Sequence, residues 1–108
     1  MILVEGVFDW LTLVQWGLPA LALVGTRVRP EALRALGARF ERVYLALDAD
    51  DAGREAADAL ARELGPRAAT LRLPAGVKDV ADLAPRPDGR VAFADVLRPE
   101  ARALAVAA

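Results

Sequence analysis

The chain has 108 residues, an apolar fraction of 56% and a net charge of −1, which indicates one small globular domain. It contains neither cysteine nor histidine, so disulfides, thiolate zinc sites and histidine catalysis are excluded. It also lacks a basic excess, a signal peptide and an apolar run long enough to cross a bilayer. We therefore expect a cytoplasmic protein without membrane contact, and not an autonomous nucleic-acid binder.

Strands and helices are predicted to alternate along the chain. Short apolar runs are typical of buried strands, and glycine or proline marks the helix ends. The expected order is strand 2–4, helix 8–16, strand 20–24, helix 30–36 stopped at Gly37, strand 43–47, helix 51–64 stopped at Gly65-Pro66, and strand 69–73.

The pattern of the strands predicts the fold class. They are apolar without polar alternation, which favours a sheet covered on both faces. Strand–helix repetition favours parallel strands with right-handed crossovers. We therefore expect an α/β domain over residues 1–84, with a four-stranded parallel sheet between helices. Residues 85–108 are expected to add a helical extension that packs on the same domain, as one helix broken around Pro99.

Acidic residues follow three of the predicted strands. Glu5-Gly6 with Asp9 follows the first, Asp48-Ala49-Asp50 follows the third, and Lys78-Asp79 with Asp82 follows the fourth across a turn. Ligands of open α/β sheets bind at the carboxyl ends of the strands. Carboxylates gathered there repel one another unless a cation neutralises them. Magnesium suits such a site because it takes hard oxygen ligands and keeps waters for a substrate.

Each acidic signal also has an ordinary structural explanation. Glu5 could favour a helix N-terminus electrostatically, and one aspartate of 48–51 could cap the following helix. Lys78 and Asp79 could form a surface ion pair. Gly53 costs a helix about 1 kcal/mol relative to alanine, and close approach of a ligand or strand would explain it. Both the structural and the functional interpretations stay open at this point.

Taken together in this order, the segments resemble a Toprim domain, the module shared by topoisomerases, primases and some nucleases. A Glu-Gly pair with an aspartate three residues beyond the glycine, plus Ala-Gly after Asp-x-Asp, is similar to bacterial-type primases and phage primase-helicases. The resemblance covers about residues 1–84 and implies a Rossmann-like Toprim fold. The segments that carry it are Val4–Asp9, Val24–Thr26, Leu47–Ala57 and Lys78–Leu83.

The resemblance implies phosphoryl or nucleotidyl transfer with Mg²⁺ or Mn²⁺. It gives catalytic and metal-binding roles to Glu5, Asp48 and Asp50. Further acids match residues that help to hold a second metal ion or orient waters, and nearby basic side chains could offset phosphate charge. These acids are Asp9, Asp79 and Asp82, and the basic residues are Lys78, Arg27, Arg29 and Arg54.

Complete primases also carry a zinc-binding domain and a basic template-binding region, and primase-helicases add helicase motifs, none of which this sequence contains. We therefore expect a stand-alone Toprim protein or a fragment of a longer enzyme. It would bind nucleotides or single-stranded nucleic acid through its metal and work with template-binding or helicase domains or subunits. Three activities stay open: a primase-type nucleotidyltransferase module for DNA replication or repair, a small nuclease that hydrolyses phosphodiester bonds, and a non-catalytic nucleotide- or protein-binding relative. The motif details favour the first.

Overall fold

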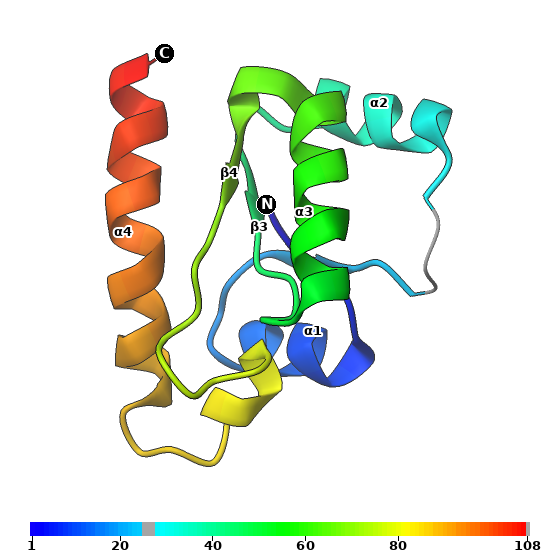
Figure 1. Ribbon diagram of the computed structural model, residues 1–108. Helices are drawn as coiled ribbons and strands as arrows, with labels where there is room; N and C mark the ends of the chain where they lie inside the picture. The colour runs from blue at the N-terminus through cyan, green and yellow to red at the C-terminus, as the bar shows by residue number, and fades with distance from the viewer. Residues whose placement is uncertain (25–27, 108) are drawn as a thin grey trace.

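The computed structural model describes residues 1–24 and 28–107, in which strands and helices alternate (Figure 1). The strands are short, and the longest helices are the third and the fourth. The elements are β1 (Ile2–Val4), α1 (Val7–Gln15), β2 (Ala20–Ala22), α2 (Pro30–Arg39), β3 (Val43–Leu45), α3 (Asp51–Leu64), β4 (Ala68–Thr70) and α4 (Gly89–Ala107), with 3-10 turns η1 (Gly65–Arg67) and η2 (Val80–Leu83).

The four strands form one parallel sheet in the order β2-β1-β3-β4. In its register, Ile2 of β1 lies between Ala20 of β2 and Tyr44 of β3. The chain thus winds outward in one direction to β2, and then crosses back over β1 to form β3 and β4. The point of reversal lies between β1 and β3, where doubly wound sheets bind their ligands. The predicted four-stranded parallel sheet is confirmed.

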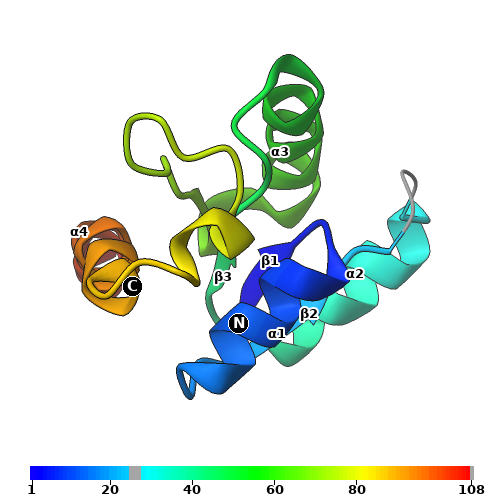
Figure 2. The same ribbon diagram turned by 90° about the horizontal axis from the view of Figure 1, so that it is seen from below.

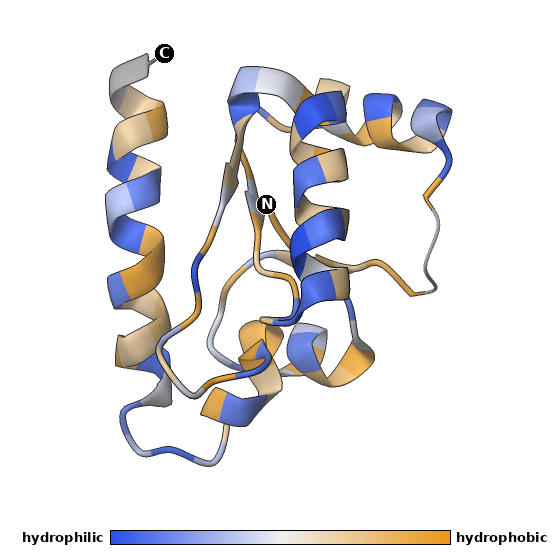
Figure 3. Cartoon of the chain, viewed as in Figure 1, coloured by the Kyte–Doolittle hydropathy of each residue, from blue (hydrophilic) through white to orange (hydrophobic). Residues whose placement is uncertain are grey.

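Two apolar cores lie on opposite faces of the sheet. Along β1, Leu3 contributes to one core and Val4 to the other, because successive strand side chains point to opposite faces. The core around Val4 includes Leu13 of α1 and Phe93 of α4. The core around Leu3 includes residues of α2 and α3, and Figure 3 shows α3 with apolar segments between hydrophilic ones. The expectation of a sheet covered on both faces is therefore confirmed.

Helix α2 continues through Gly37, where we predicted its end, and stops at Arg39. Gly37 is buried, and a Cβ atom there would come within 3.1 Å of the Leu64 side chain. The Arg67 guanidinium also donates a hydrogen bond to the Gly37 carbonyl. The glycine therefore allows α2 to pack closely against the end of α3, and the prediction of a helix stop at this position is wrong.

β1 has its predicted bounds, whereas the other three strands are shorter than predicted. β2 ends at Ala22, β3 ends at Leu45, and β4 covers residues 68–70 instead of 69–73. The Leu71 N–H still donates to the Leu45 carbonyl at 2.8 Å, but the chain then turns away from β3. Pro74 lies in this departing segment, and a proline has no N–H with which to continue a ladder.

Helix α4 is one continuous helix, although Pro99 lies inside it. Phe93 before the proline is fully buried, and Leu97 and Leu104 on either side of the proline pack against the same core. This packing holds both halves of the helix against the sheet, so the expected break at Pro99 does not occur. No helix within residues 1–24 and 28–107 has the length and apolarity needed to cross a membrane.

Candidate metal and phosphate site at the carboxyl edge of the sheet

Three acidic loops meet at the carboxyl edge of the sheet, which lies at the bottom of Figure 1 and faces the viewer in Figure 2. The loops follow β1, follow β3 and precede η2. The Ala49 N–H donates to the Lys78 carbonyl at 2.6 Å, which joins the second loop to the third. The Ala81 N–H donates to Asp9 Oδ1 at 2.9 Å, which joins the third to the first. One bond between backbone groups and one from a backbone N–H to the side chain of Asp9, in the first turn of α1, thus hold the three segments together.

Glu5 and Asp48 lie at the centre of this edge, after the adjacent strands β1 and β3. Their carboxyl groups lie close enough for Glu5 to donate a hydrogen bond to Asp48 when Glu5 is protonated. Burial raises the pKa of Glu5 to about 7, helped by this hydrogen bond and by the charges of Asp48, Asp50 and Asp9. Because two carboxylates this close repel, the pair binds a proton more tightly than an isolated carboxylate does, and a cation could take the place of that proton.

The pKa of Asp48 is also raised, mainly by burial and then by the negative charges of Asp79 and Asp50. Two interactions oppose this rise. The hydrogen bond from Glu5 stabilises the Asp48 carboxylate, and the ammonium group of Lys78 attracts it. The negative charges of Asp50 and Asp79 act on Asp48, and that of Asp50 also acts on Glu5, which places the four residues in one electrostatic cluster.

Asp9 is only 6% exposed, and backbone N–H groups occupy both of its oxygens. Oδ2 accepts a hydrogen bond from the Gly6 N–H at 3.2 Å, and Oδ1 accepts one from the Ala81 N–H at 2.9 Å. Burial raises the pKa of Asp9, while these two hydrogen bonds oppose the rise. Asp9 therefore ties the start of α1 to the start of η2, across the floor of the site.

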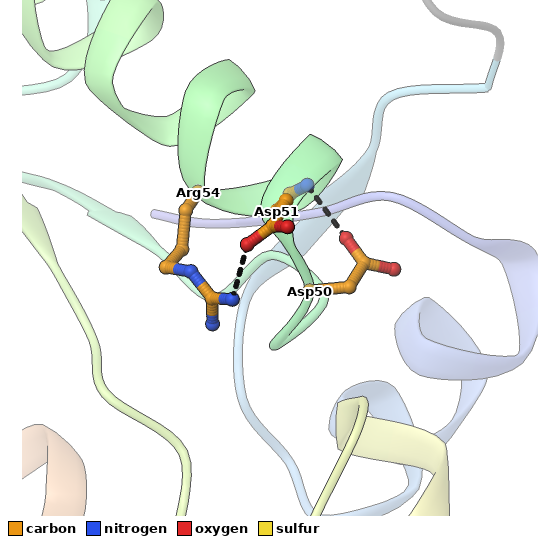
Figure 4. A network of polar contacts seen from close by, with 4 residues as sticks. Asp50, Asp51 and Arg54 are labelled. Carbon is orange, nitrogen blue, oxygen red and sulfur yellow. Dashed lines mark hydrogen bonds and ion pairs between the residues drawn. The ribbon is translucent and has the colours of Figure 1, made fainter.

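Three further acids accept hydrogen bonds from nearby backbone groups. Asp50 is the N-cap of α3 and accepts from the Gly53 N–H at 2.7 Å (Figure 4). Asp79 caps η2 by accepting from the Asp82 N–H at 2.9 Å, and Asp82 accepts from the Lys78 N–H at 2.9 Å. The capping alternative therefore holds for Asp50. Each of these carboxylates keeps a second oxygen that could face a cation.

Gly53 is explained by a close backbone approach. A Cβ atom at this position would overlap the carbonyl oxygen of Asp48, and would lie 3.1 Å from the Asp50 Oδ1 atom. Glycine therefore lets the first turn of α3 sit directly against the loop that carries both aspartates. This explanation corresponds to the close approach expected from sequence, with the protein backbone as the neighbour.

Two of the predicted phosphate-binding residues, Lys78 and Arg54, differ in the acidic side chains that they lie near. Lys78 is exposed and near enough to Asp48 to lower the pKa of that carboxyl. Ion pairs within residues 1–24 and 28–107 join Arg54 to Asp51 at 2.7 Å and Arg98 to Asp95, so Lys78 and Asp79 do not form the suggested pair. Figure 4 shows Arg54 turned toward Asp51 beside the cap.

Of the other two predicted phosphate-binding residues, the structure describes only Arg29. Arg29 is exposed and is the N-cap residue of α2, with no hydrogen bond from its side chain to the helix. Arg27 lies outside the described residues, as do Gly25 and Thr26 of the predicted motif.

The chemistry of the donors fits a hard divalent cation. Within the described ranges, no three acidic side chains already form a complete ligand set. Glu5 and Asp48 are the two carboxyls in direct contact, and both have raised pKa values because of burial and crowding. Carboxylate oxygens suit Mg²⁺ or Mn²⁺, and a site with two protein carboxylates leaves room for waters and phosphate oxygens.

Sequence reasoning missed a groove beside these loops. An open groove of about 750 Å³ runs between α3 and residues 70–78, and its lining includes Asp48, Lys78 and Arg54. Arg72 also lines the groove, and its flanking residues Leu71 and Leu73 are buried. The available signal was the alternation in Leu71-Arg72-Leu73, which places the arginine on the face opposite to the leucines.

The reversed winding of a parallel sheet, with acidic loops at its carboxyl edge, defines an α/β protein of the Rossmann-like class. A family model described as Toprim-like matches residues 2–84. The chain therefore belongs to the Toprim-like family, whose domains generally bind divalent metal ions. Comparison with curated proteins found no match.

Solved structures of primases are similar to this chain. The Aquifex aeolicus primase, in its zinc-binding and RNA polymerase domains, has a TM-score of 0.75 and 28% identity, over 91% of this chain and 25% of that one. The DnaG primase catalytic domain bound to ssDNA has a TM-score of 0.71 and 27% identity, over 92% and 33% respectively. A small TOPRIM domain protein from Bacillus stearothermophilus shares the fold, with a TM-score of 0.62 and 24% identity, over 92% and 83%. The Toprim fold is confirmed, and the chain spans a quarter to a third of the first two primase chains.

Proposed function

We propose that this chain is a primase-type Toprim module for nucleotidyl or phosphoryl transfer on nucleic acid, dependent on Mg²⁺ or Mn²⁺. The observation that carries the proposal is the contact between the Glu5 and Asp48 carboxyls, at the ends of adjacent strands and at the point where the sheet reverses. A pair of crowded carboxyls is costly in an ordinary surface loop, and a divalent cation would remove the cost. The likeness to two primase structures supports the same assignment.

The residues of the proposed site have different roles. Glu5 and Asp48 would hold the cation, with Asp50 and Asp79 close enough to add negative charge. When bound, the metal supplies Lewis acidity that polarises a phosphate and stabilises a leaving oxygen. Because the pKa of Glu5 is about 7 without a metal, cation binding near neutral pH would displace a proton from this carboxyl. Lys78, beside Asp48, would attract phosphate charge.

We further propose that the module works with other domains or subunits. Nucleic-acid affinity comes largely from neutralisation of phosphates by lysine and arginine, whereas this chain has a net charge of −1 and an acidic site. In the two primase structures above, the matching region is a quarter to a third of a longer chain. Template binding would then come from those additional parts. A cytoplasmic location remains a prediction.

Fluorescence anisotropy of a labelled single-stranded oligonucleotide at low salt tests this function. We expect weak binding that requires Mg²⁺ or Mn²⁺ and disappears when a chelator is added. Asp48→Asn should abolish the binding, whereas Asp95→Asn, which removes an equal charge from exposed α4, should preserve it.

Three outcomes would contradict parts of the proposal. Tight binding in chelator would show that contact does not depend on the metal. Primer synthesis by the purified chain would show that no further domains are needed. Metal-dependent cleavage of the oligonucleotide would favour the nuclease alternative.

A further inference from the structure

Helix α1 presents an apolar face to solvent. Asp9, Thr12 and Leu13 on its inner side are buried, and Asp9 is the only charged residue of the helix. The outer side carries large apolar residues that are 37–76% exposed and lie together on one side of the helix. These residues, which form the apolar face of α1, are Val7, Phe8, Trp10, Leu11 and Val14. The solvent side of α1 therefore carries no charge.

A comparison with α3 shows how unusual this face is. Exposed charged residues line the solvent side of α3: Arg54, Glu55, Asp58, Arg62 and Glu63. That pattern is typical of a helix that packs one side on a core and turns the other side to water. In α1, by contrast, apolar residues cover the solvent side as well, and Figure 2 shows α1 at the outside of the molecule. Within residues 1–24 and 28–107, nothing covers this face.

The area of the apolar face suits the centre of a protein interface. Its five residues expose roughly 450 Å² of mostly apolar surface, which is comparable to the largest patches that monomeric proteins show. A standard interface buries about 800 Å² on each partner, with an apolar centre inside a polar rim. The face is therefore large enough to form the centre of such an interface.

The chemistry of the face fits a second copy of this chain. A two-fold axis brings the same patch of two chains together, so the patch must be complementary to itself. An uncharged apolar face meets this requirement, whereas a patch of like charges would repel its copy. Val7, Leu11 and Val14 follow the spacing i, i+4 and i+7, which forms one ridge along the helix. Leu11 is the central residue of this nine-residue helix.

The acidic edge of the sheet decides how the two helices are oriented. α1 begins after Glu5 and Gly6, so its N-terminal end lies at the acidic edge. A two-fold axis at a right angle to α1 sets the two helices antiparallel and places these ends on opposite sides of the contact. Because a nine-residue helix is about 14 Å long, the two ends are then separated by more than the Debye length of about 8 Å. A parallel arrangement would bring the acidic ends together, and repulsion disfavours it.

We propose that two copies of this chain associate through the apolar faces of α1, with the helices antiparallel and Leu11 near the two-fold axis. The area of the face predicts a modest affinity, with a dissociation constant in the micromolar range. The contact contains no residue of the acidic site, so the association requires neither a metal ion nor nucleic acid. This inference is therefore independent of the proposed function.

Sedimentation velocity in chelator, at protein concentrations from about 5 to about 500 µM, tests the contact. The wild type should shift from one chain to two as the concentration rises. Leu11→Glu and Leu11→Lys both introduce good helix formers, and each places like charges opposite each other at the axis. Each variant should dimerise at least about tenfold more weakly than the wild type. An equal mixture of the two should dimerise more tightly than either variant alone, because the facing charges are then opposite.

Two further variants keep the test decisive if a Leu11 variant does not fold. Phe8→Ala removes the most exposed side chain of the face, so it should weaken dimerisation without disturbing the core. Val91→Glu is the matched control, because Val91 is an exposed apolar residue of α4, which lies apart from α1 in Figures 1 and 2. It should dimerise like the wild type. Melting curves show which variants fold.

Four results would overturn the inference. A wild type that stays a single chain at every concentration would leave the face to a different domain or protein. Wild-type association in the folded Leu11 and Phe8 variants, or equal weakening by Val91→Glu, would place the contact elsewhere. A mixture of Leu11→Glu and Leu11→Lys that associates no better than either alone would contradict the antiparallel two-fold contact. Growth beyond two chains would contradict a contact that closes on itself.

Discussion

Two groups of acids occupy the same edge of the sheet and differ in what their oxygens contact. Glu5 and Asp48 contact each other, and their pKa values are raised by burial and by neighbouring negative charge. Asp9 and Asp50, by contrast, accept hydrogen bonds from backbone N–H groups. The first pair is unfavourable without a cation, whereas the second group stabilises the loops that hold the pair together. Asp79 and Asp82 belong with the second group through their bonds around η2.

This difference indicates that the role of each acidic residue depends on its position relative to the first turn of the following helix. Glu5 directly follows β1, Asp48 lies three residues beyond the end of β3, and both precede the N-cap residues of α1 and α3. Asp50 is the N-cap of α3, and Asp9 lies in the first turn of α1, where backbone N–H groups lack partners within the helix. Acids of the second kind therefore satisfy the backbone, and the strand-end acids remain available for a ligand.

The largest expected effect on stability concerns Asp9. Asp9→Ala would leave the N–H groups of Gly6 and Ala81 without their acceptor in a largely buried place, at a cost of roughly 2–4 kcal/mol in the free energy of unfolding. Urea denaturation in chelator measures this loss. Glu5→Gln should show no comparable loss. Wild-type stability in Asp9→Ala would remove Asp9 from the structural group.

Asp50 should show a smaller effect. Asp50→Ala removes the cap on the Gly53 N–H and should cost about 1 kcal/mol. Asp50→Asn keeps an acceptor oxygen, relieves repulsion and should melt close to the wild type. Thermal melts of both variants in chelator give the comparison. A loss as large for asparagine as for alanine would show that the charge, and not the cap, stabilises α3.

The smallest effect is the pH dependence of the metal-free protein. The pKa of Glu5 rises from 4.5 to about 7 on folding, so the folded chain holds a proton that the unfolded chain has released. The free energy of unfolding should therefore fall as the pH rises from about 4.5 to about 7. Because Glu5 is partly exposed, we expect on the order of 1 kcal/mol or less.

Urea denaturation at pH 5 and pH 7.5 in chelator measures this fall. Glu5→Gln should reduce it, while leaving the smaller contributions of Asp48 and Asp9, whose pKa values are also raised. A steeper fall in Glu5→Gln than in the wild type would contradict the assignment of the shift to Glu5.

Local sequence signals predicted the bounds of a helix correctly where no contact from another element changed them. The bounds of α3 were predicted from an aspartate before its start and Gly65-Pro66 at its end, and the structure has the same bounds. Gly37 carries a similar local signal, but its contact with Leu64 from another helix decides its role. Such a contact depends on how α2 and α3 pack, which no window of sequence around Gly37 contains.

The candidate site was predictable in part for the same reason. The strand ends indicated which acids gather at one edge, and the structure brings Glu5, Asp48 and Asp50 into one electrostatic cluster. The use of the Asp9 oxygens was not predictable, because one of their partners, Ala81, lies 72 residues away. The groove was missed because residues 71–73 were interpreted as strand, whereas they leave the ladder and form its wall.

Titration of the chain with Mn²⁺ by calorimetry tests the division between the two groups most directly. The wild type is compared with three variants that remove a charge but keep the shape of the side chain: Glu5→Gln, Asp48→Asn and Asp50→Asn. Asp95→Asn on α4 serves as the control for lost charge. The account predicts that binding is abolished or weakened at least about tenfold in Glu5→Gln and Asp48→Asn, less in Asp50→Asn, and not at all in Asp95→Asn. Equal Mn²⁺ affinity in wild type, Glu5→Gln and Asp48→Asn would contradict it.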